Sequence, residues 1–407
     1  MIQVVVVGCG AAGMMAAYAA ADRGRQVWLL DKNEKAGKKL FITGKGRCNI
    51  TNTCDRDEFF KHIVTNSRFL YSSFHQLDNM ALISLLESRG LTTKVERGGR
   101  VFPVSDKSSD VIKVLQRMAE QAGVKIRLRT PVCGIRALEH GGFSVALENG
   151  GQILCENVIL CTGGRSYPST GSTGDGYAWA ESLGHTIVEQ VGTLVSIRTL
   201  EDWPAALSGL TLKNVTLTAF LGKKRVFFEQ GELLFTHSGI SGPLVLSASC
   251  YLAGKDPADM RLFIDLKPAL DEQALDNRVL RDFEKYKNKD IVNGLRDLLP
   301  GSMAQIFPKL LHVLPDRKIH DITREQRRGL VRLLKQLPLG VAGFAPVEEA
   351  VVTRGGVAVA QVNPQTMESK LRPGLYFAGE VLDVDALTGG YNLQIAFSTG
   401  FVAGSSV

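Results

Sequence analysis

Residues 4–13 read Val-Val-Val-Val-Gly-Cys-Gly-Ala-Ala-Gly, and a run of mostly small residues follows from 14 to 21. The four valines predict a buried strand, the glycines a tight turn and the small residues a helix. This strand–turn–helix context makes a G-x-G-x-x-G motif informative as a dinucleotide-binding fingerprint. Gly8 permits the turn, Gly10 lets the backbone approach a pyrophosphate, and Gly13 allows the helix to pack closely on the strand.

A second predicted strand runs from Gln26 to Leu30 and ends on Asp31. An acid about 20 residues beyond the glycines is where a ribose-binding carboxylate belongs in a dinucleotide fold. The helix that opens at Ala11 and Ala12 supplies free N–H donors and a positive dipole end for the phosphates. The alternative is a glycine-rich turn in an ordinary α/β core. The combination of strand, turn, helix, second strand and acid predicts a dinucleotide site.

The composition is that of an ordinary globular protein, with 407 residues, 44% of them hydrophobic and 22% charged. This length predicts two or three domains. The apolar first twenty residues lack a preceding basic residue, so we do not expect a secretory signal, and no apolar run is long enough for a membrane span. The seven cysteines form no C-x-x-C pair. We therefore expect a cytoplasmic protein with no metal site and no membrane partner.

The charge is basic, with a formal net charge of +7 and a pI near 9.0. Either this is a solvated basic surface, or it serves a polyanionic partner, RNA above all. Residues 271–337 contain 14 basic and 10 acidic side chains. Five cations there fall largely on one side of a predicted helix, either as an RNA-facing stripe or as a solvated face. They are Arg324, Arg327, Arg328, Arg332 and Lys335.

The loop from Lys32 to Asn52 is dense in lysine and glycine. It fails the P-loop motif, because its glycine spacing is wrong and no Ser or Thr follows Lys45. We interpret it as wrapping the phosphates and ring of the cofactor; the alternative is a surface loop. Cys48 is its most notable thiol, because Arg47 and the nearby lysines favour a thiolate.

The rest of the first half alternates helices and strands. The last strand, 158–161, runs into Thr162-Gly163-Gly164, where a sheet strand could meet the cofactor. If the dinucleotide is FAD, the strand that begins at Val132 could reach its adenine side; the alternative is an ordinary core valine. The hydroxyl- and glycine-rich run 166–176 is either a pocket wall or a capping loop. Helices are predicted at 69–89, 109–122 and 177–183, a hairpin at 93–104, and strands at 125–128, 132–138 and 143–147.

The second half changes character and then returns to α/β patterning. Strands are predicted at 195–197, 210–221, 225–230 and 232–235, and helices over 271–337 interrupted by Pro300, Pro308 and Pro315.

The final segment predicts strands at 350–353 and 375–380, a turn at 354–357, and a last helix that opens at 388–394. The first N–H groups of that helix could face the electron-poor pyrimidine edge of a flavin. The two ends of the chain therefore build one cofactor domain. No second G-x-G-x-x-G follows a strand, so NAD(P)H would visit the flavin transiently.

Several motifs together resemble the BaiN/RdsA family of FAD-dependent oxidoreductases, over essentially the whole chain. Besides the first glycines, they are Thr43-Gly44-Lys45-Gly46-Arg47-Cys48-Asn49-x-Thr51-Asn52, Gly99-Arg100-Val101-Phe102-Pro103, Thr236-His237-x-Gly239-Ile240-Ser241-Gly242-Pro243, and Gly379-Glu380-x-x-Asp383 through Gln394. Lys45 departs from the pattern, because the resemblance implies glycine there.

The resemblance implies an α/β protein with tightly bound FAD, a Rossmann-like FAD-binding domain, an inserted β-barrel-like domain and a helical domain. We expect the FAD-binding domain at 1–190 and 351–407, the β-rich domain at 191–270 and 338–350, and the helical domain at 271–337. Members have two reductive roles: dihydrouridine synthesis in large-subunit ribosomal RNA, and reduction of unsaturated steroids in bile-acid metabolism. Both add a hydride and a proton across an activated C=C bond.

The basic charge favours ribosomal RNA as substrate. We expect NAD(P)H to reduce FAD, hydride to reach C6 of uracil, and a protein acid to protonate C5. Candidate acids are Cys48, His237 and Tyr391. The alternative for each is that the side chain only packs in the core or fixes a loop. Other interpretations are a small-molecule ene-reductase or a non-enzymatic flavin-bearing factor.

The candidate cofactor-binding residues come from five segments of the chain. They are Gly8, Gly10, Ala11, Ala12, Gly13, Asp31, Lys32, Lys38, Lys39, Thr43, Gly44, Arg47, Cys48, Asn49, Val132, Thr162, Gly163, Gly379, Glu380, Asn392, Leu393 and Gln394.

Overall fold

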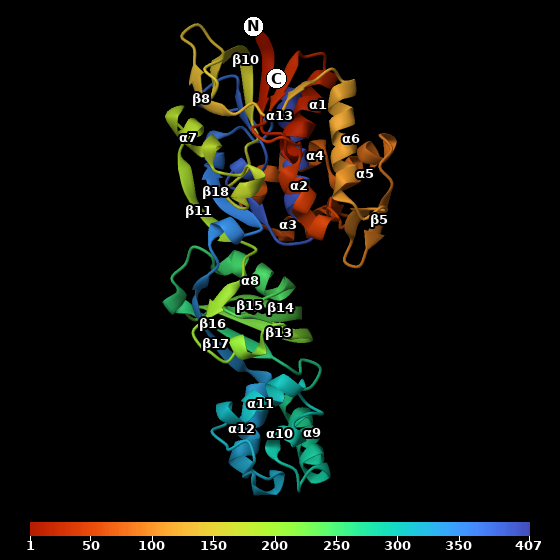
Figure 1. Ribbon diagram of the computed structural model, residues 1–407, viewed down its shortest axis with the longest axis vertical. Coiled ribbons are helices and arrows are strands. Elements are labelled where there is room, and N and C mark those ends of the chain that lie inside the picture. Colours follow the sequence, from red (N-terminus) through yellow and green to blue (C-terminus); the bar gives the residue numbers. More distant parts are fainter. The chain divides into compact units, whose positions relative to one another are not determined.

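A computed structural model describes all residues, 1–407. The chain forms two compact units, and each is described by itself. The first unit joins Met1–Thr193 to Pro346–Val407, and the second is Leu194–Ala345. The colours of Figure 1 show the first unit built from both the red and the blue ends of the chain.

A seven-stranded sheet is the centre of the first unit, in the order β7-β2-β1-β10-β9-β8, with β19 also paired to β10. Strands β7, β2, β1, β10 and β19 pair in parallel, whereas β9 pairs antiparallel with β10 and β8 pairs antiparallel with β9. This confirms the predicted α/β class with a Rossmann-type sheet. The bounds are β1 Ile2–Val7, β2 Val27–Leu30, β7 Lys125–Arg127, β8 Val132–Ala137, β9 Phe143–Leu147, β10 Gln152–Leu160 and β19 Leu375–Phe377.

Strand β1 holds the centre of this sheet. Val4 pairs with Asn157 of β10 on one side and with Val27 of β2 on the other. Val4, Val5 and Val6 are fully buried. A strand covered on both faces needs a continuous apolar run, which the four valines provide.

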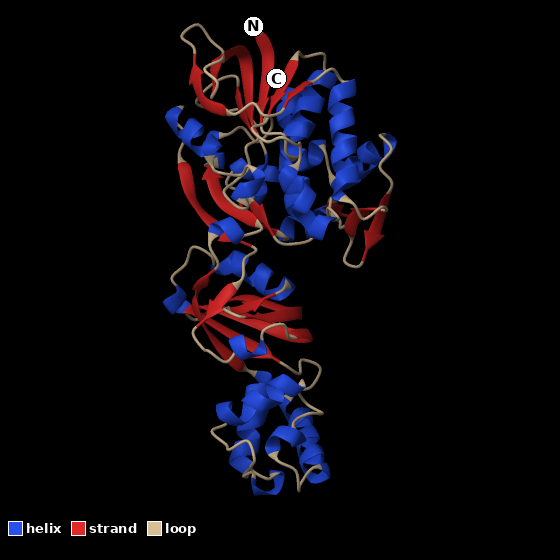
Figure 2. Ribbon diagram, in the orientation of Figure 1, coloured by secondary structure: helices blue, strands red, loops and turns tan.

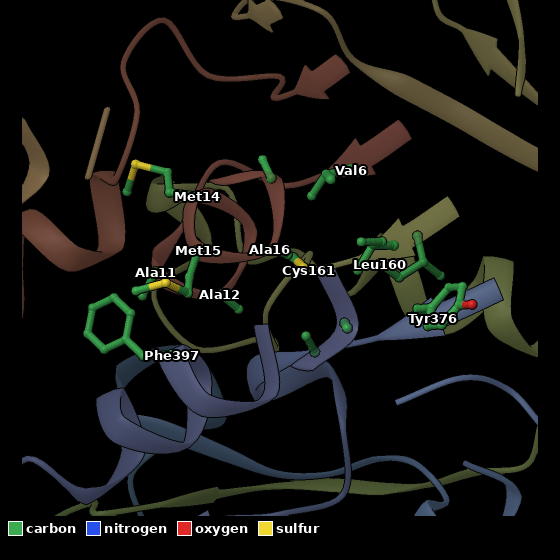
Figure 3. Close-up of a cluster of buried hydrophobic side chains, with 14 of the residues drawn as sticks. Val6, Ala11, Ala12, Met14, Met15, Ala16, Leu160, Cys161, Tyr376 and Phe397 are labelled. Carbon is green, nitrogen blue, oxygen red and sulfur yellow. The ribbon is translucent and has the colours of Figure 1, made fainter. Parts of the chain in front are cut away.

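Two helices from opposite ends of the chain, α1 (Ala11–Asp22) and α13 (Tyr391–Ser406), lie side by side. A Cβ added to Gly404 would lie 2.1 Å from the carbonyl oxygen of Ala16, and one added to Gly400 would lie 2.4 Å from that of Ala12. Figure 3 shows the same interface, with Ala12 beside the α13 ribbon. The small residues allow the two backbones to approach closely, so both chain ends share one core.

The predicted helix at 69–89 is wrong as a continuous element. The structure has α4 (Tyr71–Gln76) and α5 (Asn79–Ser88), with Leu77 in a non-helical conformation between them. Asp78 caps α5, because its carboxylate accepts a hydrogen bond from the N–H of Ala81 at 2.7 Å. Asp favours an N-cap over a helix interior, and here it starts a new helix.

The remaining elements surround the sheet. The predicted hairpin at 93–104 is confirmed as β5 and β6, and the predicted helix at 109–122 as α6. The turn expected at 354–357 is wrong, because these residues belong to β18, which pairs antiparallel with β11. The bounds are α2 Lys38–Ile42, β3 Thr51–Asn52, α3 Arg56–Lys61, β4 Ile63–Thr65, β5 Thr93–Glu96, β6 Arg100–Pro103, α6 Ser108–Gln121, α7 Asp175–Ser182, β11 Ile187–Thr193, β18 Val352–Val357 and β20 Asp385–Ala386.

The second unit contains a closed barrel in the order β12-β15-β14-β13-β16-β17, which confirms the predicted β-barrel insertion. The strands expected at 225–230 and 232–235 form one continuous strand, β14. Figure 2 draws these strands in red and the helices between β16 and β17 in blue. The bounds are β12 Ile197–Thr199, β13 Thr211–Leu221, β14 Lys224–Thr236, β15 Gly239–Ser241, α8 Pro243–Leu252, β16 Met260–Asp265 and β17 Leu337–Phe344.

Four helices connect β16 to β17. They are α9 Glu272–Lys285, α10 Ile291–Gly294, α11 Gly301–Leu310 and α12 Arg324–Lys335. Pro308, expected to interrupt the helices, lies inside α11 close to its end. There it removes one hydrogen bond without ending the helix. No helix of the chain combines the length and apolar character that a membrane crossing requires.

The cations expected to share one side of α12 divide into two groups. Arg327 pairs with Asp276 at 3.2 Å, and Lys335 pairs with Asp265 at 2.6 Å, so these two are held against the protein. Arg324, Arg328 and Arg332 are exposed, spaced four residues apart, and form no ion pair. This α12 ridge is the solvent-facing part of the expected stripe.

Gly404→Ala tests the close contact of α1 and α13. Alanine in a helix interior ordinarily stabilises a protein by about 0.5–1 kcal/mol relative to glycine. Here the added methyl meets the Ala16 carbonyl, so we expect thermal unfolding to show a loss of about 1–3 kcal/mol instead. Gly329→Ala in α12 is the control, because its Cβ would lie 3.5 Å from Leu311 Cδ2 and should stabilise. Equal stability of Gly404→Ala and the parent chain would contradict the packing.

Candidate cofactor site

The three glycines after β1 have three different surroundings. Gly8 has φ +105°, and a Cβ there would lie 2.4 Å from the carbonyl oxygen of Cys161. A Cβ on Gly13 would lie 1.8 Å from the carbonyl oxygen of Gly8. These geometries confirm the predicted turn at Gly8 and the predicted close packing at Gly13. A Cβ on Gly10 would have no atom within 4 Å, so Gly10 faces open space.

The N-terminus of α1 begins at that open space. Gly10 is its N-cap, and no side chain caps the helix. The first N–H groups of an α-helix have no partner within the helix and lie at the positive end of its dipole. This end of α1 can therefore bind an anion such as a pyrophosphate.

Asp31 follows β2 and lies against the glycine turn. Its carboxylate accepts hydrogen bonds from the N–H of Cys9 at 2.6 Å and from that of Asn33 at 2.7 Å. Each carboxylate oxygen has a second lone pair that remains available to a ligand hydroxyl. The acid is thus fixed beside the turn, where the sequence predicts it.

Two candidate residues present buried polar atoms without a hydrogen-bond partner. These atoms are Asn49 Oδ1 and Thr162 Oγ1. The Thr162 hydroxyl packs against Gly176, where a Cβ would lie 2.0 Å from it. Buried polar atoms are nearly always hydrogen-bonded in native proteins, so an orphaned pair indicates a ligand that completes them. Together with the open space at Gly10, they fit a bound dinucleotide.

Lys39 and Glu380, both expected to contact the cofactor, pair with each other. Lys39 Nζ lies 2.6 Å from Glu380 Oε2 and donates to Ser166 Oγ at 2.6 Å. The other carboxylate oxygen of Glu380 accepts from the N–H of Thr353 at 2.8 Å. The pair joins segments 341 positions apart in the chain. Ser166 begins the hydroxyl-rich run 166–176 that the sequence singles out, whereas the sequence assigns Thr353 to a strand and to no site.

The other basic candidates also have acidic partners. Lys32 Nζ lies 2.5 Å from Asp175 Oδ2, and Lys38 lies 3.5 Å from Glu34. Their charges are therefore shared with neighbouring carboxylates, not left free for phosphates.

Arg47 is held in the same way. It forms ion pairs with Glu96 and Asp106, and its guanidinium carbon lies 4.2 Å from the ring centroid of Phe102. The carboxylates raise the pKa of Arg47, and in return its charge lowers the pKa of Glu96. Arg47 therefore fixes the loop to β5 and β6.

The expectation that Cys48 is a thiolate is wrong. Its side chain is completely buried, and burial raises the pKa of the thiol to about 12. Arg47 does not stabilise the thiolate, because its guanidinium is paired with Glu96 and Asp106. Thr43 contacts the thiol, with its own hydroxyl donating to the carbonyl oxygen of Leu40 at 2.7 Å.

The glycine-rich loop has left-handed backbone at successive residues. Gly44 has φ +57°, Lys45 has φ +58° and Gly46 has φ +83°. Only glycine adopts this region without strain, so Lys45 occupies a position built for glycine. This agrees with the glycine that the family pattern implies there.

The remaining catalytic candidates lie in different units. Tyr391 begins α13 in the first unit, is buried, and stacks on His62 with ring centroids 4.4 Å apart. Burial and the neighbouring Cys54 raise the pKa of its phenol well above the ordinary value. His237 lies in the turn between β14 and β15 of the second unit. The hydroxyl of the adjacent Thr236 is buried and unpartnered.

Two side chains at the start of α13 are occupied within the protein. Gln394 is fully buried; its amide donates to the carbonyl oxygen of Leu77 at 3.0 Å and its oxygen accepts from Thr51 Oγ1 at 2.6 Å. Asn392 donates to the carbonyl oxygen of Ala386 at 2.8 Å. What this helix start can offer a ligand is its backbone, including the N–H of Leu393.

The last candidates are backbone and edge positions. Gly379 has φ +77°, and its N–H donates to Thr399 Oγ1 at 3.0 Å. Gly163, after β10, has φ +74°. Val132 begins β8, is half-buried, and pairs with Leu147 of β9.

Comparisons with known proteins give one consistent result. The family model of the HI0933-like protein Rossmann domain matches residues 2–406. The chain is 32% identical to a 3-dehydro-bile acid delta(4,6)-reductase of Clostridium scindens, over 99% of this chain and 98% of that protein. It is also 32% identical to a ribosomal RNA dihydrouridine synthase of Haemophilus influenzae, over 99% and 98%.

A solved structure shares the fold. The 3-ketosteroid-delta4-(5alpha)-dehydrogenase of Rhodococcus jostii aligns with a TM-score of 0.53 at 16% identity, covering 99% of this chain and 96% of that chain. At this identity the likeness concerns the fold alone.

Alkylation of the cysteines tests the burial of Cys48. We expect iodoacetamide at mildly alkaline pH to modify the exposed Cys133 first and to leave Cys48 unmodified. Cys48 is buried, and its raised pKa keeps it as the unreactive thiol. Mass mapping of the native protein reads this out, with the denatured chain, in which all seven cysteines should react, as control. Labelling of Cys48 at the rate of Cys133 would show that it is accessible.

Proposed function

The chain belongs to the HI0933-like Rossmann family and is an enzyme of the oxidoreductase type, and we propose that it uses FAD to saturate an activated carbon–carbon double bond. The observation that carries the proposal is that two kinds of relative, each at 32% identity over nearly the whole chain, are named for the same chemistry. Dihydrouridine formation and steroid reduction both add two hydrogens to a double bond conjugated with a carbonyl.

The first unit supplies the groups that FAD requires. Gly10, Ala11 and Ala12 would receive the pyrophosphate at the start of α1, and Asp31 a ribose. Asn49 and Thr162 would complete their hydrogen bonds on the bound cofactor, beside Gly163. When bound, FAD supplies hydride transfer, taking electrons from NAD(P)H and giving them to the substrate carbon.

The reaction also needs a protein acid to protonate the second carbon. Tyr391 is the candidate in the first unit, because it lies at the start of α13, where backbone N–H groups can face a ligand. Burial raises the pKa of its phenol, so the group is protonated at neutral pH but is a weak acid. The complete burial of Cys48 argues against that thiol. His237 stays a candidate from the second unit.

Uridine in large-subunit ribosomal RNA is the substrate that the charge favours. The net charge is +7, and the α12 ridge presents three exposed arginines without ion pairs. Basic surface of this kind attracts the phosphate backbone of RNA. The second candidate is a small unsaturated steroid or enone, which the match to the bile-acid reductase supports equally in identity and coverage.

Gly10→Ala tests the cofactor site without disturbing the fold. The methyl would enter open space, so we expect unchanged thermal unfolding of the apoprotein. FAD binding should be at least about tenfold weaker, because the methyl would occupy the space that the pyrophosphate needs. Flavin absorbance after titration with FAD measures this, and Gly329→Ala serves as control. Parent-like FAD affinity in Gly10→Ala would place the phosphates elsewhere.

Mass spectrometry of ribosomal RNA tests the substrate. We expect large-subunit RNA from cells with the protein to contain dihydrouridine that is missing from cells without it. Purified protein with FAD and NADH or NADPH should form the same nucleoside in RNA transcribed in vitro. Identical RNA from both cells, with rapid reduction of a steroid enone in vitro, would favour the second candidate.

A further inference from the structure

One outward face of the barrel carries three phenylalanines. Cross-strand register places Thr218 of β13 opposite Phe228 of β14 and Phe263 of β16, and Phe220 of β13 opposite Arg225 and Arg261. Residues two apart on a strand share a face, and a β-bulge between Phe227 and Arg225 brings Arg225, three positions from Phe228, onto that same face. These side chains therefore all lie on one side of the sheet. The buried Ala219 and Leu262, between them in sequence, point into the barrel. The barrel face is defined here as Phe220, Phe228, Phe263, Arg225 and Arg261.

Of the three phenylalanines of the barrel face, Phe228 is the most exposed. Phe228 is 59% exposed, and the guanidinium carbon of Arg225 lies 4.9 Å from its ring centroid. Phe220 and Phe263 are half-buried, with ring centroids 5.9 Å apart and ring planes nearly perpendicular. An exposed aromatic cluster rimmed by polar groups marks an interaction site.

The rim of the barrel face is positive. Lys223 lies in the turn between β13 and β14, Lys224 and Arg225 begin β14, and all three are exposed without an ion pair. Arg261 donates to the carbonyl oxygen of Gly222 at 3.0 Å, which holds the turn beside the face.

The acids near this rim are few. Asp259 is exposed next to the turn. Glu229 pairs with the buried Leu217, so the register places its side chain on the opposite face of the sheet from the phenylalanines. Asp265, two positions from Phe263 on β16 and on the same face, is paired with Lys335 at 2.6 Å. The four cations Lys223, Lys224, Arg225 and Arg261 therefore exceed the unpaired acids beside them.

We propose that the barrel face binds a single-stranded segment of RNA, with unpaired bases stacked on Phe228 and its neighbours and phosphates held by the surrounding cations. Aromatic rings on an open sheet face, flanked by arginine and lysine, are the chemistry by which proteins hold unpaired bases. A double-helical segment cannot use the face, because its bases are already stacked on one another. The proposal rests on the ribosomal RNA form of the proposed function and assigns a surface to it.

The barrel face differs in kind from the α12 ridge. The ridge has arginines alone and can attract any polyanion. The face combines cations with stacking surface, so it selects unpaired nucleic acid from other anions. This difference gives the two effects separate signatures in a binding measurement.

Fluorescence anisotropy of a labelled single-stranded oligouridine on the full-length, FAD-loaded protein measures the binding. We expect Phe228→Ala to weaken it by about 5-fold to 150-fold, the range for loss of one stacked base, with no change in its salt dependence. Phe228→Trp should keep the affinity, because it keeps the stacking surface. Arg225→Gln should lower the slope of log affinity against log salt by about 0.7. A duplex of the same sequence should compete poorly.

Leu314→Ala and Arg281→Gln are the matched controls. The first removes an exposed apolar side chain of the second unit, as Phe228→Ala does, and the second removes an exposed arginine, as Arg225→Gln does. Both should bind oligouridine like the parent protein. Retained flavin absorbance shows that the first unit is intact in every variant.

The outcomes separate this proposal from the proposed function. If the parent protein forms dihydrouridine and Phe228→Ala has unchanged affinity and an unchanged KM for RNA, the barrel face is refuted and the function stands. If the parent protein binds no oligouridine and forms no dihydrouridine, the RNA function fails and the face with it. Preferential binding of the face to anionic phospholipid vesicles over oligouridine would also overturn the proposal.

Discussion

The contact between α1 and α13 is the constraint on which the first unit depends. The carbonyl oxygens of Ala12 and Ala16 face Gly400 and Gly404, where no side chain fits. Because α1 starts at the glycine turn, its position determines where the free N–H groups point. The last helix of the chain therefore fixes the orientation of the first, and the candidate cofactor site exists only when both ends have folded together.

The basic side chains around the candidate cofactor site are paired with acids of the same unit. Lys32, Lys38, Lys39 and Arg47 all have carboxylate partners in the first unit. The anion-binding capacity at the turn is thus left to backbone N–H groups and the helix dipole. Such groups are rigid and cost little reorganisation, whereas a lysine would have to exchange one partner for another. The Lys39–Glu380 pair instead joins the two segments that close the unit.

Local signals were sufficient for the parts of the fold in which neighbouring residues decide the outcome. The valine strand, the roles of Gly8 and Gly13, and the hairpin at 93–104 all follow from residues a few positions apart. The break at Leu77 is local only in part: Asp78 caps the next helix, but the carbonyl oxygen of Leu77 accepts from Gln394 and Ser398, more than 300 positions away. The side chain of Gln394, predicted to bind the cofactor, is held within the protein by the same kind of long-range contact.

Long-range contacts also explain the errors at the glycine-rich loop. The density of cations around Cys48 suggested a thiolate, but the sequence does not reveal that Glu96 and Asp106 take up the charge of Arg47. Nor does it reveal that Cys48 is fully buried. The αL backbone of Lys45, by contrast, agrees with a glycine pattern that can be read without a structure.

The way the chain enters and leaves the barrel has a structural consequence. In the first unit, β11 and β18 pair so that Thr193 lies opposite Val352, and in the second the N–H of Ala345 donates to the carbonyl oxygen of Ser196 at 3.1 Å. In each unit, the residues where the chain crosses to the other unit and where it crosses back are therefore neighbours. A barrel closed on itself also has no free edge strand to aggregate. A segment with adjacent entry and exit can be inserted or replaced as a whole without interrupting the sheet of the first unit.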